Sequence, residues 1–168
     1  ADGEYRRAVR DDAARICRIA EQERLTVTFE FHGGTLTDSI PSLLALRQAA
    51  DSPAFRSGWQ PTGNAAPQQR REELREVLPF LSTVHVFHWL PGGLRMPLAD
   101  GEPEWCEYLR ILARSGRDIP VMLEFVRDDS ARQLSADART LKKMIAAIDS
   151  SASRQGSSGA DNFRRESV

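Results

Sequence analysis

The stretch TVTFEFHGG, residues Thr26 to Gly34, combines the pattern of a β-strand with two polar side chains, Glu30 and His32. β-branched and aromatic residues alternate with polar ones along it, and a glycine pair closes it. This pattern predicts a short strand followed by a loop. Because burying a carboxylate without a partner costs several kcal/mol, we expect Glu30 to be paired.

Two further segments place polar side chains at the same point of a strand. PVMLEFV, Pro120 to Val126, is almost wholly apolar except for Glu124, and a polar turn follows it. TVHVFHW, Thr83 to Trp89, carries His85 and His88. All 3 histidines of the chain fall in these strand-end segments, which indicates a pattern rather than chance.

Hydrophobic periodicity along the rest of the chain predicts that strands and helices alternate four times. Such alternation is typical of parallel strands joined by right-handed crossovers, with helices outside. We expect one α/β domain over 4–149, built from four (βα) units of a TIM barrel, and a flexible Ser/Gly-rich tail over 150–168. The expected strand segments are 26–31, 56–60, 83–88 and 121–126, and the expected helices are 5–23, 38–50, 68–81, 102–115 and 130–148.

The carboxyl ends of these strands are the expected location of a functional site, because barrel enzymes place their site residues there. The loop over 90–101 is long and rich in Gly and Pro, and loops of that length in compact domains tend to be functional. Six polar residues lie at or near strand ends and are expected to converge: Glu30, His32, Gln60, His85, His88 and Glu124.

Composition excludes several classes of partner. Lys and Arg number 23 and Asp and Glu number 24 among 168 residues, giving a net charge of -1. This balance offers no electrostatic basis for binding nucleic acid or an anionic membrane surface. No apolar stretch approaches the roughly 20 residues that a membrane-spanning helix needs. We expect a soluble, cytoplasmic protein that binds a small molecule.

Two carboxylates, one imidazole and one amide oxygen form a ligand set that suits Mn²⁺, Mg²⁺ or Co²⁺, with Zn²⁺ also possible. Such an ion polarises a carbonyl and its neighbouring hydroxyl, so that the proton on the adjacent carbon becomes removable and an enediolate is stabilised. One carboxylate can remove that proton and a second can return it. This chemistry is aldose–ketose isomerisation or epimerisation.

The segments FEFHGGTLTDS, WQP, VHVFHW, PLADGEPEW and LEFVRDD resemble the xylose isomerase-like barrels, in particular the sugar phosphate isomerase/epimerase group. The resemblance covers residues 25–148. It implies that Glu30, Gln60, His85 and Glu124 bind a divalent cation, most simply Mn²⁺. It also implies that Glu30 and Glu124 form the acid/base pair. Gln60 departs from the usual Asp and brings no charge.

Other residues have less specific signals. Arg95 in the long loop can hold a substrate hydroxyl or phosphate, or lie on the solvated surface. His32 and His88 can contact substrate or support a ligand, and Trp59 and Trp89 either wall the pocket or pack in the core. The structural alternatives for the main residues are an ion pair with a helix arginine for the two glutamates and a core hydrogen bond for His85.

The resemblance implies eight βα units, whereas this chain holds four, which correspond to the C-terminal half. Either the first half is missing, or two copies pair as a homodimer so that their open sheet edges close. Two other functions remain open. Metal-assisted phosphodiester hydrolysis, as in apurinic endonucleases, uses more His and Asp ligands than this chain offers. The second of these functions is not enzymatic: a half-barrel that acts as a dimeric binding or scaffold module.

Overall fold

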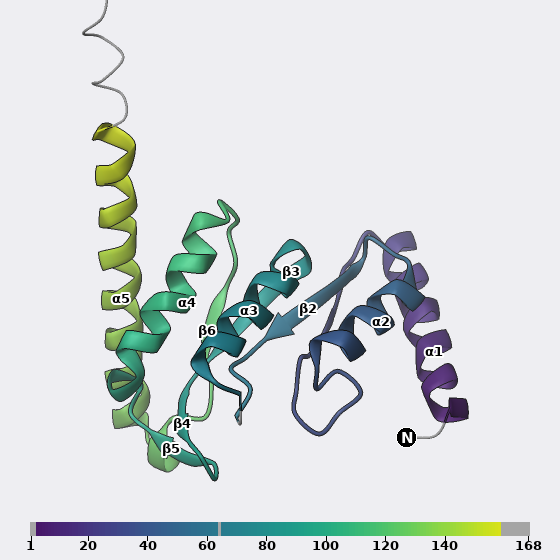
Figure 1. Cartoon of the computed structure of the whole chain (residues 1–168), viewed down its shortest axis with the longest axis horizontal. Helices are drawn as coiled ribbons and strands as arrows, with labels where there is room; N and C mark the ends of the chain where they lie inside the picture. Colours follow the sequence, from purple (N-terminus) through teal and green to yellow (C-terminus); the bar gives the residue numbers. More distant parts are fainter. Residues whose placement is uncertain (1–2, 64, 159–168) are drawn as a thin grey trace, which may run out of the picture.

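A computed structural model describes residues 3–63 and 65–158 of the chain (Figure 1). Helices and strands alternate along it, as the sequence predicts. The sequence patterns account for this, because each helix presents an apolar stripe and each strand of the main sheet is short and rich in β-branched or aromatic residues. The helices are α1 (Gly3–Gln22), α2 (Ile40–Ala50), α3 (Pro67–Val77), α4 (Glu102–Arg114) and α5 (Ala131–Ser158).

Four strands form one parallel sheet in the order β1-β2-β3-β6. Its register pairs His85 with Met122 and Trp59 with Val84, and a β-bulge shifts the pairing of β2 with β3 after Ser57. The prediction of an α/β fold with four parallel strands and surrounding helices is confirmed. The strands are β1 (Val27–Phe29), β2 (Phe55–Trp59), β3 (Leu81–Val86) and β6 (Val121–Leu123).

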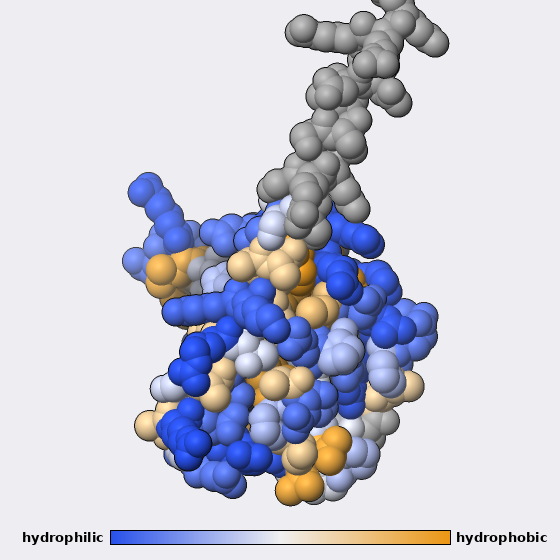
Figure 2. Space-filling view, turned by 90° about the vertical axis from the view of Figure 1, so that its left-hand side faces the viewer, coloured by the Kyte–Doolittle hydropathy of each residue, from blue (hydrophilic) through white to orange (hydrophobic). Residues whose placement is uncertain are grey.

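The helices cover one face of the sheet. Each helix contacts the next one along the chain, from α1 to α5, so they form a single curved layer (Figure 1). Beneath that layer, Phe55 and Val84 are at most 1% exposed and belong to the hydrophobic core, and partly buried strand side chains such as Phe29 pack against it. The side of the layer that α5 presents is mostly hydrophilic, with only small separate hydrophobic patches, which suits a helix facing solvent (Figure 2).

The other face of the sheet is uncovered within the part of the chain that the structure describes, although apolar parallel strands normally have both faces covered. Its side chains include the small and polar Thr28 and Thr83, which alternate with the core positions. A Cβ on Gly58 would contact the methyl groups of both threonines, so the three lie on the same face. Met122, on the same face through its pairing with His85, is 48% exposed.

The long loop expected over 90–101 contains regular structure instead. β4 (His88–Leu90) and β5 (Leu94–Met96) form an antiparallel hairpin, and a 3-10 helix, Leu98–Gly101, follows. Gly92 and Gly93 adopt φ values of 86° and 82°, the left-handed region that glycine enters without steric cost. Glycines that indicated a loop therefore form the turn of a hairpin, and His88 belongs to that hairpin rather than to the sheet strand before it.

Several boundaries differ from those expected. The helix expected over 68–81 ends at Val77 and continues as a 3-10 turn over Leu78–Phe80, because Pro79 cannot donate the backbone hydrogen bond that an α-helix needs. α5 continues through Ser158 into the expected tail, since a formed helix adds residues at little cost. The rest of that tail, 159–168, lies outside the described residues. No described helix is long and apolar enough to cross a membrane.

Two adjacent leucines of α2 test the assignment of its buried face. Leu43 is 0% exposed and Leu44 is 37% exposed. We expect Leu43→Ala to lower the free energy of unfolding by about 2–5 kcal/mol, because it removes a fully buried side chain and leaves a cavity. Leu44→Ala, with the same change in helix propensity, should cost less than about 1 kcal/mol. Urea denaturation followed by circular dichroism measures both, and equal losses would contradict the assignment.

Candidate functional site

The four residues expected to bind a metal lie at the carboxyl ends of the four sheet strands. Glu30, Gln60 and Glu124 are each the first residue after a strand, at the ends of β1, β2 and β6, and His85 is the next-to-last residue of β3. Because the strands are parallel, these ends all lie at the same side of the sheet. The sheet itself thus brings together residues that are far apart in the sequence.

The imidazole of His85 lies between two carboxylates. Its Nδ1 is 3.1 Å from Oε2 of Glu124 and 3.8 Å from Oε1 of Glu30. The side chains of His85, Glu124 and Glu30 are 20%, 32% and 51% exposed, so Glu30 has the most room to rotate. Oε2 of Glu124 is buried and makes no hydrogen bond, so its approach to Nδ1 is a close contact without hydrogen-bond geometry.

This donor set fits a divalent cation in chemistry. Carboxylate oxygens and an imidazole nitrogen are common ligands of such ions, and the buried, unpartnered Oε2 of Glu124 is a position that a cation would satisfy. The fit in geometry is incomplete. No group of three or more His, Cys, Asp and Glu side chains is gathered as a ready metal cluster within residues 3–63 and 65–158. The 3.8 Å between His85 Nδ1 and Glu30 Oε1 does not prevent both atoms from binding one ion, because ligand atoms about 2.1 Å from an ion lie roughly 3–4 Å apart.

Beside these residues, the loops after the strands enclose a cavity of about 160 Å³. Gln60 is on its wall and is only 8% exposed, and its amide oxygen Oε1 is buried without a hydrogen-bond partner in the described chain. His32 is also on the wall, where its Nδ1 lies 2.8 Å from the carbonyl oxygen of Gly33. The full lining is Phe31, His32, Gly33, Gln60, Pro61, Thr62, Gly63, Phe87, Trp89 and Phe125.

Three aromatic rings form one side of this cavity. The ring centroid of Trp89 is 5.0 Å from those of both Phe87 and Phe125. The guanidinium of Arg95 lies over the ring of Phe125 at 5.2 Å, and its Nη1 is 2.5 Å from Oδ1 of Asp129. The structure thus places Arg95 beside the aromatic rings, with its charge already paired.

Two residues expected to contact substrate, Trp59 and His88, do not line the 160 Å³ cavity. Trp59 is 1% exposed and lies in the core, with its ring edge-to-face against Tyr108 at 5.1 Å, because its position in β2 faces the helix layer. His88 packs against Gly101, where an added Cβ would lie only 2.5 Å from the imidazole Nδ1. His88 lines a smaller cavity together with Arg70 and Tyr108, and this cavity shares four wall residues with the first: Pro61, Gly63, Phe87 and Trp89.

A polar network that the sequence reading missed holds the loop after β2. Arg70 of α3 donates from Nε to the carbonyl oxygen of Thr62 at 2.9 Å, and its Nη1 lies 3.0 Å from Oε1 of Glu104. The hydroxyl of Tyr108 donates to the same carboxylate. The spacing of Glu104 and Tyr108, four residues apart on α4, is a signal that could have revealed half of this network.

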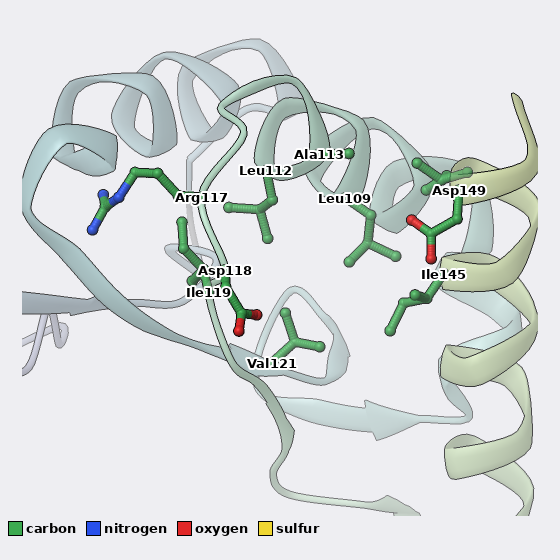
Figure 3. A pocket seen from close by; sticks show the side chains of 10 residues that line it. Leu109, Leu112, Ala113, Arg117, Asp118, Ile119, Val121, Ile145 and Asp149 are labelled. Atoms are coloured by element: carbon green, nitrogen blue, oxygen red, sulfur yellow. The ribbon is translucent and has the colours of Figure 1, made fainter. Parts of the chain in front are cut away.

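A second cavity, of about 250 Å³, lies at the other end of β6 between α4 and α5 (Figure 3). Leu109, Leu112 and Ile145 line it, together with residues that precede or begin β6. It holds none of the expected site residues, and it adjoins the amino end of the strand, where barrel enzymes do not place their catalytic groups. The smaller cavity at the carboxyl ends is therefore the better candidate.

Comparison with known proteins supports the fold but names no family. No family model matches the chain, and no curated protein matches it. A probable 3-DHS dehydratase, AsbF, involved in petrobactin synthesis from Bacillus anthracis, aligns with 79% of this chain and 55% of its own, at 18% identity and a TM-score of 0.66. An L-ribulose 3-epimerase aligns with 95% of this chain and 59% of its own, at 13% identity and a TM-score of 0.55.

The chain therefore spans little more than half the length of these two proteins. At such low identities the likeness concerns the fold. It supports the expected α/β fold of a TIM-barrel kind, of which the described residues contain four parallel strands.

The network around Tyr108 predicts a pH dependence of stability. Burial, and then the hydrogen bond and charge of Glu104, raise the pKa of the Tyr108 phenol above its usual value of about 10. Because the folded-state pKa is the higher one, this contribution is fully present below pH about 10 and is lost as the pH rises through the folded-state pKa. The free energy of unfolding, measured by urea titration, should fall above pH about 10 more steeply in wild type than in Tyr108→Phe; parallel curves would contradict the network.

Proposed function

We propose that this chain carries the metal-binding part of a divalent-metal-dependent isomerase or epimerase that acts on a sugar or a sugar phosphate. The observation that carries the proposal is the imidazole of His85 between Glu124 and Glu30, at 3.1 and 3.8 Å. These three residues would hold the ion, most simply Mn²⁺. When bound, the ion would act as a Lewis acid on the carbonyl and hydroxyl oxygens of the substrate.

The two glutamates would move the proton. Glu30 has the more exposed side chain, so its carboxylate is placed to accept the proton from the carbon beside the substrate carbonyl, leaving the electron pair on the substrate. In isomerisation a protonated Glu124 would give its proton to the former carbonyl carbon, while the hydroxyl proton would pass to the former carbonyl oxygen. In epimerisation it would give its proton to the opposite face of the carbon that lost one, and exchange with solvent would restore both glutamates. His85, held between them, would fix the separation of the two carboxylates.

The proposed site is open on the side of the uncovered sheet face. β1 and β6 are the two edges of the sheet, and four more parallel strands would close an eight-stranded barrel. We propose that a second set of four βα units covers this face, supplied by a second copy of the chain or by another half-barrel. The uncovered face also favours the alternative function, a non-catalytic half-barrel that works as a dimeric binding or scaffold module.

Calorimetric titration with Mn²⁺ tests the metal site. We expect one ion per chain, with affinity reduced by at least about tenfold in Glu124→Gln and in His85→Asn, because each removes one of few ligands. Glu76→Gln is the matched control, since Glu76 is exposed on α3 and is none of the proposed ligands. No binding by the folded wild type, or equal binding by all variants, would remove the proposed metal site and favour the non-catalytic alternative.

Light scattering coupled to size exclusion tests closure by a second copy. If two chains pair through their uncovered faces, the measured mass should be twice 18.8 kDa. Met122→Lys should shift the mass to that of one chain, because it places a charge on the face that would become the barrel interior. A wild-type protein with the mass of one chain would show that a second copy does not cover this face.

A further inference from the structure

We infer that a cavity between α1 and α2 binds a small organic anion, namely a phosphate or carboxylate group attached to an apolar body, and that Arg6 and Arg10 hold the anionic group. This α1–α2 cavity has a volume of about 220 Å³. Residues from the first half of each helix border it, together with Leu36 from the loop after β1. Among the described residues it shares none of its wall with the 160 Å³ cavity, so the inference goes beyond the proposed function.

The α1–α2 cavity belongs to the helix layer. α1 and α2 lie side by side at one end of that layer and contact each other (Figure 1). The uncovered face of the sheet lies on the other side of the strands, so the cavity is separate from the face where further βα units are proposed. A ligand in this cavity therefore belongs to a second site, away from the proposed metal ligands.

Two arginines on the cavity wall have no partner of their own. Neither Arg6 nor Arg10 makes an ion pair or a side-chain hydrogen bond within the described residues. Three arginines that border other cavities do have partners. Arg70 lies 3.0 Å from a carboxylate oxygen of Glu104, Arg117 donates to the carbonyl oxygen of Leu81 at 2.8 Å, and Arg47 lies 4.7 Å from the ring centroid of Phe80. The guanidinium groups of Arg6 and Arg10 are therefore available to a ligand.

The spacing of these two arginines has a cost that an anion would offset. Arg6 and Arg10 are four residues apart on α1, and like charges at this spacing repel each other and destabilise a helix. Among the described residues, no acid lies three or four positions from either of them, whereas Arg7 has Glu4 and Asp11 at these spacings. Guanidinium groups bind phosphate and carboxylate through paired hydrogen bonds, so one anion can bind both side chains and remove the repulsion.

The rest of the wall suits an apolar body. Leu46 is only 6% exposed, and the partly buried Val9 packs against the same core. The described part of the wall contains no acidic side chain, and the hydroxyl of Ser42, which makes no hydrogen bond within the described residues, can donate to the anion. Because a cavity of about 150 Å³ can hold a benzene ring, this one has room for a ring and part of an anionic group. Apolar walls with a few polar groups are the usual form of a small-molecule site.

NMR titration of the isotope-labelled chain, without added metal, tests the inference with three probes. Phenyl phosphate supplies the anion and the ring together, inorganic phosphate supplies the anion alone, and benzyl alcohol supplies the ring alone. We expect phenyl phosphate to shift the amide signals of the first halves of α1 and α2. It should bind at least about fivefold more tightly than either other probe, because only this probe uses both the arginines and the apolar wall.

Three arginine variants show which charges matter. Arg6→Gln and Arg10→Gln should each weaken the binding of phenyl phosphate by about tenfold, the effect of one lost charge-assisted contact. Arg7→Gln is the matched control, because Arg7 is an exposed residue of the same helix that does not border the cavity, and its loss changes the net charge equally. Its affinity should change by less than about twofold, since exposed charges are screened by salt.

Circular dichroism checks that each variant is folded, which is expected because all three arginines are exposed. The inference would be overturned by any of three results: no binding of phenyl phosphate, equal affinities for phenyl phosphate and inorganic phosphate, or the same loss in Arg7→Gln as in the other two variants. Shifts confined to the loops at the carboxyl ends of the strands would also overturn it, because they would place the anion in the other cavity. The titration contains no Mn²⁺, so its failure would leave the proposed metal site unaffected.

Discussion

The position of Glu124 beside His85 depends on the parallel hydrogen-bond ladder between β3 and β6. The backbone N–H of Glu124 donates to the carbonyl oxygen of Val86 at 3.0 Å, which extends the ladder one residue beyond β6. This hydrogen bond fixes the position of Glu124 along the direction of β3. His85 is the residue before Val86, which supplies the acceptor oxygen. The 3.1 Å approach of the two side chains follows from that register. A shift by one residue would turn Glu124 to the other face of the sheet.

Side chains that bond to the backbone hold the loops around the candidate site. The hydroxyl of Thr37 donates to the carbonyl oxygen of Glu30 at 2.5 Å and so ties the segment after β1 to the loop that leads into α2. Arg70 does the same for the loop after β2 through Thr62. Loops carry the functional residues in many folds, and these two bonds limit the freedom of the loops after β1 and β2. The cavity therefore has walls fixed from several elements.

The two faces of the sheet differ in the side chains that they carry. The helix-covered face is filled by large apolar side chains such as Trp59 and Phe55 and provides the stability of the fold. The uncovered face carries small polar side chains such as Thr28 and Thr83 together with the exposed Met122, and the carboxylates lie where its strands end. This asymmetry links the proposed chemistry with the proposed second set of βα units, because strands enclose the interior of a barrel on all sides, whereas this face is open within the described residues.

The sequence by itself predicted the alternation of strands and helices, the parallel sheet and the strand-end location of Glu30 and Glu124, because hydrophobic periodicity and chain order are local properties. It missed the β4–β5 hairpin, since Gly92 and Gly93 indicate a turn without showing that the flanking residues pair. Only the tertiary structure decided which side chains meet. The contact of Arg70 with Glu104, and the burial of Gln60 beside aromatic rings from other loops, depend on packing between distant segments, which no local pattern encodes.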